Sequence, residues 1–204
     1  MDELFESVKK RAKEVEVRKI IVASSTGDSA KRAIRELGTQ DHEIIVVTDR
    51  AEVVWDVASM SEKAREEYEI KAEEKEHPSG ISYSSPIRKE LKDMGINWII
   101  QATEIFRAIN VPGGYNVAQV IAQTLYLFGA GTKVAIEITL IACDAGAVKA
   151  GEDVIAIAGK NKGLNTALLL TTAHTDEFFG IGLPDSKKPI QKLRVKEVIY
   201  KRDW

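Results

Sequence analysis

The chain has 204 residues, of which 44% are hydrophobic and 29% charged, and its formal net charge is -2. This composition fits one globular domain with a full core, and the balanced charge argues against a general nucleic-acid or membrane partner. No apolar run reaches the roughly 18 residues of a membrane span, the N-terminus is too charged for a secretory signal, and the single Cys143 excludes an internal disulfide, so we expect a cytoplasmic protein.

The first 50 residues alternate between helix and strand patterns. Residues 3–16 place apolar side chains on one helical face, and residues 18–24 (RKIIVAS) form a β-branched run typical of a buried parallel strand. Residues 30–37 repeat the helical spacing up to Gly38, and residues 43–49 (EIIVVTD) form a second strand. The order helix, strand, helix, strand predicts a right-handed parallel crossover.

Residues 49–77 differ in character from the rest of the chain. They carry ten acidic and five basic residues, and residues 61–77 have a helix-like pattern. We interpret them as a charged insertion, either a solvated helix or an ordered segment, within a single domain that spans residues 1–204. The sequence HPSG (77–80) is expected to break this tract.

The second half of the chain continues the alternation. Residues 85–95 predict a short helix that begins at a serine-proline, and residues 96–102 (INWIIQA) predict a strand. A glycine turn at Gly113 and Gly114 leads into a helix whose apolar face would contain Val117, Val120, Ile121, Thr124, Leu125 and Phe128.

The last third combines a helix with three strands. Residues 132–146 favour a buried helix with Val134, Ile138, Ile141 and Ala145 facing inward. Strands are expected within residues 152–159, 165–173 and 194–201. The elements together predict a three-layer α/β fold, in which helices flank a mainly parallel sheet.

The stretch between the first strand and the next helix is rich in hydroxyl groups. Ser24, Ser25, Thr26, Gly27, Asp28 and Ser29 stand there in succession. A helix N-terminus offers unpaired N–H groups and a partial positive charge that favour a phosphate, short hydroxyls add donors, and a glycine permits close approach. Serine and threonine before a helix are also common caps, so phosphate binding and simple capping both remain open.

Other chemistries are less well supported. Neither the P-loop pattern nor a complete G-x-G-x-x-G is present. Glu137 and Asp144 would share one face of a helix, about 10.5 Å apart along its axis, as a polar site or as capping groups. His174, near Asp176, has the chemistry of a general base but no partner nucleophile, and the three histidines lack metal-ligand spacing.

Two separated stretches resemble one known family. The motif IIVASSTGDSAKRAIRELG, followed by EIIVVTD, is similar to the start of the C-terminal α/β domain of pyruvate kinase, and GAVKAGEDVIAIAGKNKGLNTALLL is similar to its final part. The closer likeness is to stand-alone, mostly archaeal proteins with this domain. The length leaves no room for the catalytic barrel of pyruvate kinase beside such a domain, so we do not expect kinase activity.

The resemblance implies a ligand site with named residues. Ser24, Thr26, Gly27 and Ser29 would bind a phosphate, and the loop from Gly159 to Gly163 would close over the ligand. The site implied in this way contains Ser24, Ser25, Thr26, Gly27, Asp28, Ser29, Thr48, Gly113, Gly114, Gly159, Lys160, Asn161, Gly163 and Thr166. Asp28 departs from the arginine that many pyruvate kinases carry there, which argues against a sugar bisphosphate.

The resemblance also implies a ligand and an assembly. The stand-alone group is associated with flavin mononucleotide (FMN), so FMN is the expected phosphorylated ligand. The alternatives are a flavin-dependent enzyme, with the flavin ring near Thr48 and Gly113–Gly114, and a purely structural or subunit-interaction domain. Because the domain associates with itself in pyruvate kinases, a homo-oligomer is expected, with the first helix and the last strand as its edge elements.

Overall fold

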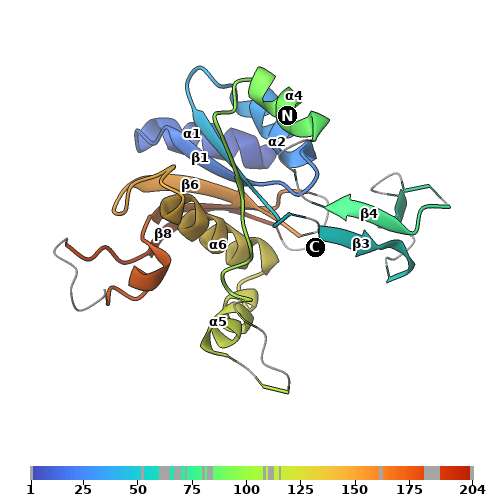
Figure 1. Cartoon of the computed structure of the whole chain (residues 1–204). Coiled ribbons are helices and arrows are strands. Elements are labelled where there is room, and N and C mark those ends of the chain that lie inside the picture. The colour runs from blue at the N-terminus through green and yellow to red at the C-terminus, as the bar shows by residue number, and fades with distance from the viewer. Residues whose placement is uncertain are drawn as a thin grey trace.

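The computed structural model describes residues 2–51, 53–59, 65–66, 70–71, 73–79, 81, 85–107, 109, 113–114, 116–160, 163–181 and 189–202. Its centre is a six-stranded sheet with the order β5-β2-β1-β6-β7-β8 (Figure 1). The strands are β1 (Lys19–Ala23), β2 (Glu43–Thr48), β5 (Trp98–Gln101), β6 (Asp153–Ala158), β7 (Thr166–Thr171) and β8 (Arg194–Lys201).

Four neighbouring strands form the parallel part of the sheet. β1 pairs in parallel with β2 and with β6, and β2 pairs in parallel with β5. β7 and β8 extend the sheet in antiparallel pairings. The mainly parallel α/β fold predicted from the sequence is therefore confirmed. The order of the strands reverses between β1 and β6, which is where sheets of this type bind their ligands.

Helices cover both faces of the sheet and create two cores. On one face lie α1 (Glu3–Glu14), α2 (Asp28–Leu37) and α4 (Pro86–Asp93), and on the other lie α5 (Val117–Tyr126) and α6 (Ala130–Asp144). Side chains of a strand alternate between faces, so Ile20 and Val22 join the first core and Ile21 joins the second. Each fully buried side chain of this size contributes about 1.5–3 kcal/mol.

Local signals in the sequence begin and end the helices. The Asp2 carboxylate accepts the N–H of Leu4 at the start of α1, and the Ser85 hydroxyl accepts the N–H of Arg88 at the start of α4. α2 ends at Gly38, as expected, with φ of 75°. Each cap satisfies backbone groups that the helix itself leaves unpaired.

The charged insertion contains a small sheet of its own. β3 (Val53–Asp56) pairs antiparallel with β4 (Glu76–Ser79), and this pair projects to the right of the main sheet in Figure 1. The expected break of the helix-like tract at residues 77–80 agrees with this arrangement, because His77, Pro78 and Ser79 belong to a strand and not to a helix. A proline is tolerated there because each strand of a two-stranded sheet is an edge strand. Residues 61–64, 67–69 and 72 of the helix-like tract lie outside the described residues.

The predicted buried helix at 132–146 is confirmed as α6, but two details of the second core differ from the prediction. Ala145 is exposed, because it is the C-cap of α6. On α5, Val117 and Val120 are 75% and 55% exposed, and Phe128, which follows the helix, is 59% exposed, so the predicted apolar face lies only partly inward. Among the described residues, no helix is long and apolar enough to cross a bilayer.

Candidate functional site

Three predicted site segments meet at one edge of the sheet. Ala23 at the end of β1 lies opposite Val47 of β2, and Val22 lies opposite Ile157 of β6. Ser24 and Gly159, which follow β1 and β6, and Thr48, the last residue of β2, therefore lie at the same edge of the sheet. This carboxyl edge includes the point where the strand order reverses, the usual ligand position in an open α/β sheet.

The Ser24 side chain organises the hydroxyl loop. Ser24 is 5% exposed, and its oxygen accepts the backbone N–H groups of Gly27 and Ala30, both at 3.2 Å. Gly27 adopts φ of 99°, in the left-handed region that glycine favours, and places α2 directly after the loop. Ser24 is thus a structural cap, as one of the two open interpretations predicted.

The start of α2 keeps further donors available. The backbone N–H groups of Asp28 and Ser29 have no acceptor among the described residues, and the hydroxyls of Ser25 and Ser29 likewise bond to none of them. The Thr26 hydroxyl donates to Asp28 Oδ2 at 3.0 Å, which holds the carboxylate on the side of Thr26. The first turn therefore presents N–H groups that an anion could accept, next to a tethered carboxylate.

Gly27 and Thr48 also contribute to the structure around the site. A Cβ atom on Gly27 would lie 2.5 Å from Cγ2 of Ile87, so the glycine allows α4 to pack against the loop. The Thr48 oxygen accepts the N–H of Ile81 at 3.0 Å, and Thr48 is 5% exposed. Thr48 consequently anchors the chain where it returns from the insertion to the core.

The two ends of the β6–β7 connection approach each other closely at the same edge. A Cβ atom on Gly159 would lie 1.9 Å from the Gly163 carbonyl oxygen, which only glycine avoids. Gly163 has φ of 129°, Lys160 is exposed, and Asn161 lies outside the described residues. The two glycines thus shape the loop that the resemblance places over a ligand.

The N-terminus of α6 reaches this edge as well. Thr166 donates its hydroxyl to Asn165 Oδ1 at 2.9 Å, and both side chains are buried. A Cβ atom on Gly131 would lie 2.2 Å from Thr166 Oγ1 and 2.4 Å from Asn165 Oδ1. The sequence reasoning included Thr166 but missed Gly131 and Asn165, although the glycine pair Gly129–Gly131 at a helix start was a usable signal.

A buried charge cluster lies one turn further along α6. Lys133 Nζ lies 2.6 Å from Glu137 Oε2 and 3.1 Å from Glu104 Oε2, and the N–H of Phe106 donates to Glu137 Oε1 at 2.9 Å. Lys133 and Glu137 are 2% and 3% exposed. The sequence reasoning missed Lys133 and Glu104; a lysine and a glutamate four residues apart in an apolar run are the signal for such a pair.

Burial and neighbouring charges shift the pKa values of both Lys133 and Glu137. Burial raises the pKa of the Glu137 carboxyl, against the opposing effect of its hydrogen bonds from Lys133 and Phe106. Burial alone would lower the pKa of the Lys133 ammonium, but the hydrogen bond and charge of Glu137 and the charge of Glu104 raise it. The cluster therefore contains a fully charged lysine between two carboxylates.

Gly113 and Gly114 lie elsewhere in the molecule. Both are exposed and precede α5, which forms the lower end of the molecule in Figure 1, whereas α2 lies at the top. The structure therefore does not bring these glycines together with the hydroxyl loop. A ring position that spans Thr48 and this glycine turn gains no support from the geometry.

Asp144 and His174 form a separate cluster at the other end of α6. Asp144 Oδ1 lies 3.1 Å from His174 Nδ1 and also accepts the N–H of Thr175 at 3.1 Å. Asp144 therefore caps the turn that follows β7, while Glu137 is engaged by Lys133. Cys143, 3.8 Å from His174, is 1% exposed, and burial raises its pKa to about 11, so its thiol is a poor nucleophile.

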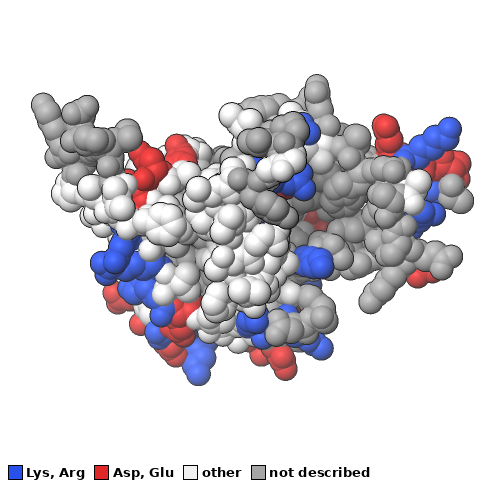
Figure 2. Space-filling model, turned by 90° about the horizontal axis from the view of Figure 1, so that it is seen from below, with Lys and Arg blue, Asp and Glu red and all other residues white. Residues whose placement is uncertain are grey.

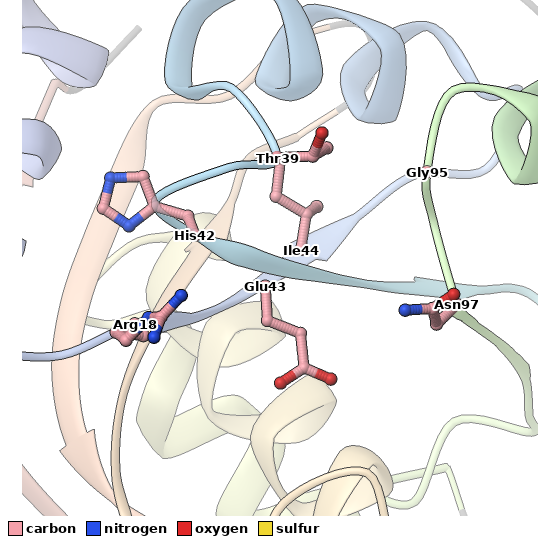
Figure 3. A pocket seen from close by; sticks show the side chains of 7 residues that line it. All are labelled: Arg18, Thr39, His42, Glu43, Ile44, Gly95 and Asn97. Carbon is pink, nitrogen blue, oxygen red and sulfur yellow. The ribbon is translucent and has the colours of Figure 1, made fainter.

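Cavities also occur at the opposite, amino edge of the sheet. One of about 130 Å³ is lined by Arg18, Thr39, His42, Glu43, Ile44, Gly95 and Asn97. Figure 3 shows His42 and Arg18 at one end of this pocket and Asn97 at the other, with Glu43 pointing away from Thr39. Burial lowers the pKa of the His42 imidazole. The small volume and the Glu43 carboxylate disfavour a nucleotide here.

One comparison with known proteins bears on these observations. The family model described as "Pyruvate kinase, alpha/beta domain" matches residues 2–170. The matched span runs from α1 to β7 and includes the hydroxyl loop, Thr48 and the β6–β7 connection.

Proposed function

The chain belongs to the pyruvate kinase alpha/beta domain family, and from this premise we propose that its carboxyl edge binds a phosphorylated small molecule, with FMN as the specific candidate. The phosphate is assigned to the first turn of α2. The observation that carries the proposal is the pair of backbone N–H groups at Asp28 and Ser29, which have no acceptor among the described residues. Such donors at a helix N-terminus favour an anion.

The surrounding residues support the same assignment. Ser24 and Gly27 fix the loop that leads into the first turn of α2, where Asp28 is exposed, and Ser25 and Ser29 add hydroxyl donors without bulk. Asp28 would repel a phosphate, but its carboxylate is tied to the Thr26 hydroxyl. The proposal assigns residues to the phosphate group of FMN and leaves the contacts of its ring unassigned.

Titration calorimetry with FMN, riboflavin and inorganic phosphate tests the proposal. Ser29→Ala should weaken FMN about tenfold to a hundredfold, because a hydrogen bond to a charged group contributes about 1.5–3 kcal/mol. Thr26→Ala should also weaken FMN, because it releases the Asp28 carboxylate, which would then repel the phosphate. Riboflavin, which lacks the phosphate, should bind more weakly than FMN and respond to neither substitution. Thr124→Ala, which removes an exposed hydroxyl bonded to the Val120 carbonyl of α5, is the matched control.

Thermal unfolding of each variant separates binding from capping. If Thr26→Ala and Ser29→Ala lower the melting temperature but leave the FMN affinity unchanged, the hydroxyls are caps only, and the proposal is wrong. Equal affinities for FMN and riboflavin would also contradict it, because the phosphate would then contribute nothing. If a different phosphorylated compound binds tightly and FMN does not, the assignment of the phosphate site would stand, but FMN would not be its ligand.

A further inference from the structure

The segment around α5 contains no charged residue. Residues 108–132 lack Asp, Glu, Lys and Arg, in a chain that is 29% charged overall. α5 has an inner apolar face, with Ala122 buried and Ile121 and Leu125 packed on the second core. This inner face is sufficient to attach α5 to the domain. The apolar side chains on the other faces of α5 therefore need a separate explanation.

A second apolar face points away from the core. Val117, Val120 and Leu127 are 75%, 55% and 83% exposed, and Thr124 between them is also exposed. These four residues, which we call the α5 stripe, follow the 3-4-3 spacing of the seam between two paired helices. An exposed helix that solvent alone surrounds carries charged residues on its outer face, so the α5 stripe indicates a helical partner.

Neighbouring side chains enlarge this face. Phe128, Phe179 and Ile181 are 59%, 64% and 76% exposed. An apolar cavity of about 350 Å³ adjoins Val117 and is lined also by Ile121, Phe178 and Ile181. Figure 2, which views the molecule from the α5 end, shows an uncharged face at the centre with basic and acidic residues at its sides. Six large exposed apolar side chains, Val117, Val120, Leu127, Phe128, Phe179 and Ile181, thus lie on this face, and contiguous exposed apolar side chains of this kind mark interaction surfaces.

We propose that two copies of this chain pair through the α5 stripe, with one α5 packed against the other about a twofold axis. The absence of charge selects this occupant. A partner that buries an uncharged seam must itself be apolar and uncharged there, and a second α5 supplies that surface in a self-complementary form. A helix that binds a membrane surface typically carries Lys or Arg on its own polar face, and residues 108–132 contain none.

The sequence that follows Ile181 is chemically unsuited to bury the α5 stripe. Residues 182–188 (GLPDSKK) carry one acidic and two basic residues and a proline. Burying these groups against apolar side chains would cost free energy without a partner for each charge. The second copy therefore remains the occupant that the chemistry favours.

Sedimentation velocity on the full chain tests the proposal. The wild type should sediment as a dimer of the 22.5 kDa chain at micromolar concentration, and Leu127→Glu should weaken the dimer at least about a hundredfold. Leu127 is 83% exposed, so the melting temperature at low concentration should not change. The matched control is Val198→Glu on β8, which is 54% exposed and tests pairing through the last strand; this variant should remain dimeric.

Three outcomes would overturn the proposal. The wild type sedimenting as a monomer at about 100 μM would exclude the dimer. Dissociation by Val198→Glu but not by Leu127→Glu would move the interface to β8. A monomer that binds vesicles of neutral lipid through Leu127 would show that a membrane covers the α5 stripe instead.

Discussion

Lys133 Nζ and Glu137 Oε2, on successive turns of α6, lie 2.6 Å apart, and both side chains are almost completely buried. Removing the lysine leaves an unpaired buried carboxylate, so Lys133→Met should lower the free energy of unfolding by about 3–5 kcal/mol, as measured by urea denaturation. The double variant Lys133→Met/Glu137→Met should be closer to the wild type, because it leaves no unpaired charge.

The same variant should show a distinctive pH dependence. Burial raises the pKa of Glu137, and without Lys133 the carboxyl takes up a proton more readily. The folded state then binds more protons than the unfolded state, so the stability lost in Lys133→Met should be smaller at pH 5 than at pH 8. Lys196→Met, which breaks the exposed pair with Asp153, is the control and should change stability by about 1 kcal/mol or less. Equal losses in the two variants would contradict the prediction.

Gly131→Ala should destabilise the protein although alanine is the better helix former. The new Cβ would lie 2.2 Å from Thr166 Oγ1 and 2.4 Å from Asn165 Oδ1. With two such contacts we expect the overpacking to cost close to about 3 kcal/mol, which exceeds the roughly 1 kcal/mol gained in helix propensity. Combining it with Thr166→Ala should restore part of the loss in thermal unfolding. A Gly131→Ala variant as stable as the wild type would show that α6 is free to shift away from β7.

His42 should make the fold less stable in mild acid. Burial lowers the pKa of its imidazole from the ordinary 6.5 in the folded chain. At a pH between the lowered pKa and 6.5, the unfolded chain therefore binds a proton at His42 that the folded chain does not bind. Stability should therefore fall as the pH drops from about 7 through 6.5 and level off below the lowered pKa. In His42→Gln, urea denaturation should show a shallower loss between pH 7 and pH 5; an identical profile would contradict the role of His42.

The single cysteine should report global unfolding. Cys143 is 1% exposed, and burial raises its pKa to about 11, so at pH 8 a disulfide reagent should react far more slowly with the native protein than with the denatured chain. Increasing urea should accelerate the reaction in step with the fraction unfolded, as followed by circular dichroism. Rapid labelling under native conditions would show that the end of α6 opens on its own.

The charged insertion should be dispensable for the main fold. Val57 is the one buried apolar side chain among its described residues and joins neither core cluster, whereas Ile81, directly after it, is fully buried and bonded to Thr48. Deleting residues 51–79 should therefore preserve one cooperative unfolding transition, with a stability change of about 1 kcal/mol, because loop length affects the entropy of folding only weakly. Loss of cooperativity would place the β3–β4 pair within the folding unit.

Local patterns in the sequence were sufficient for most of the fold. Alternating β-branched runs and helical spacing identified β1, α2, β2 and α6, because each pattern reflects which side of an element is buried. The hydroxyl cluster before α2 located the candidate phosphate site, since capping residues and the helix N-terminus are adjacent in the chain.

Tertiary structure alone decided the relationships between distant segments. Three contacts depend on how the elements pack: Gly131 against Thr166, Lys133 between Glu104 and Glu137, and the Thr48 hydrogen bond to Ile81. The hydrophobic periodicity of each element does not predict that packing. The exposed stripe of α5 is the clearest case. An apolar helical face predicts burial, but a monomer's core has room for only one face of α5, and the other remains at the surface.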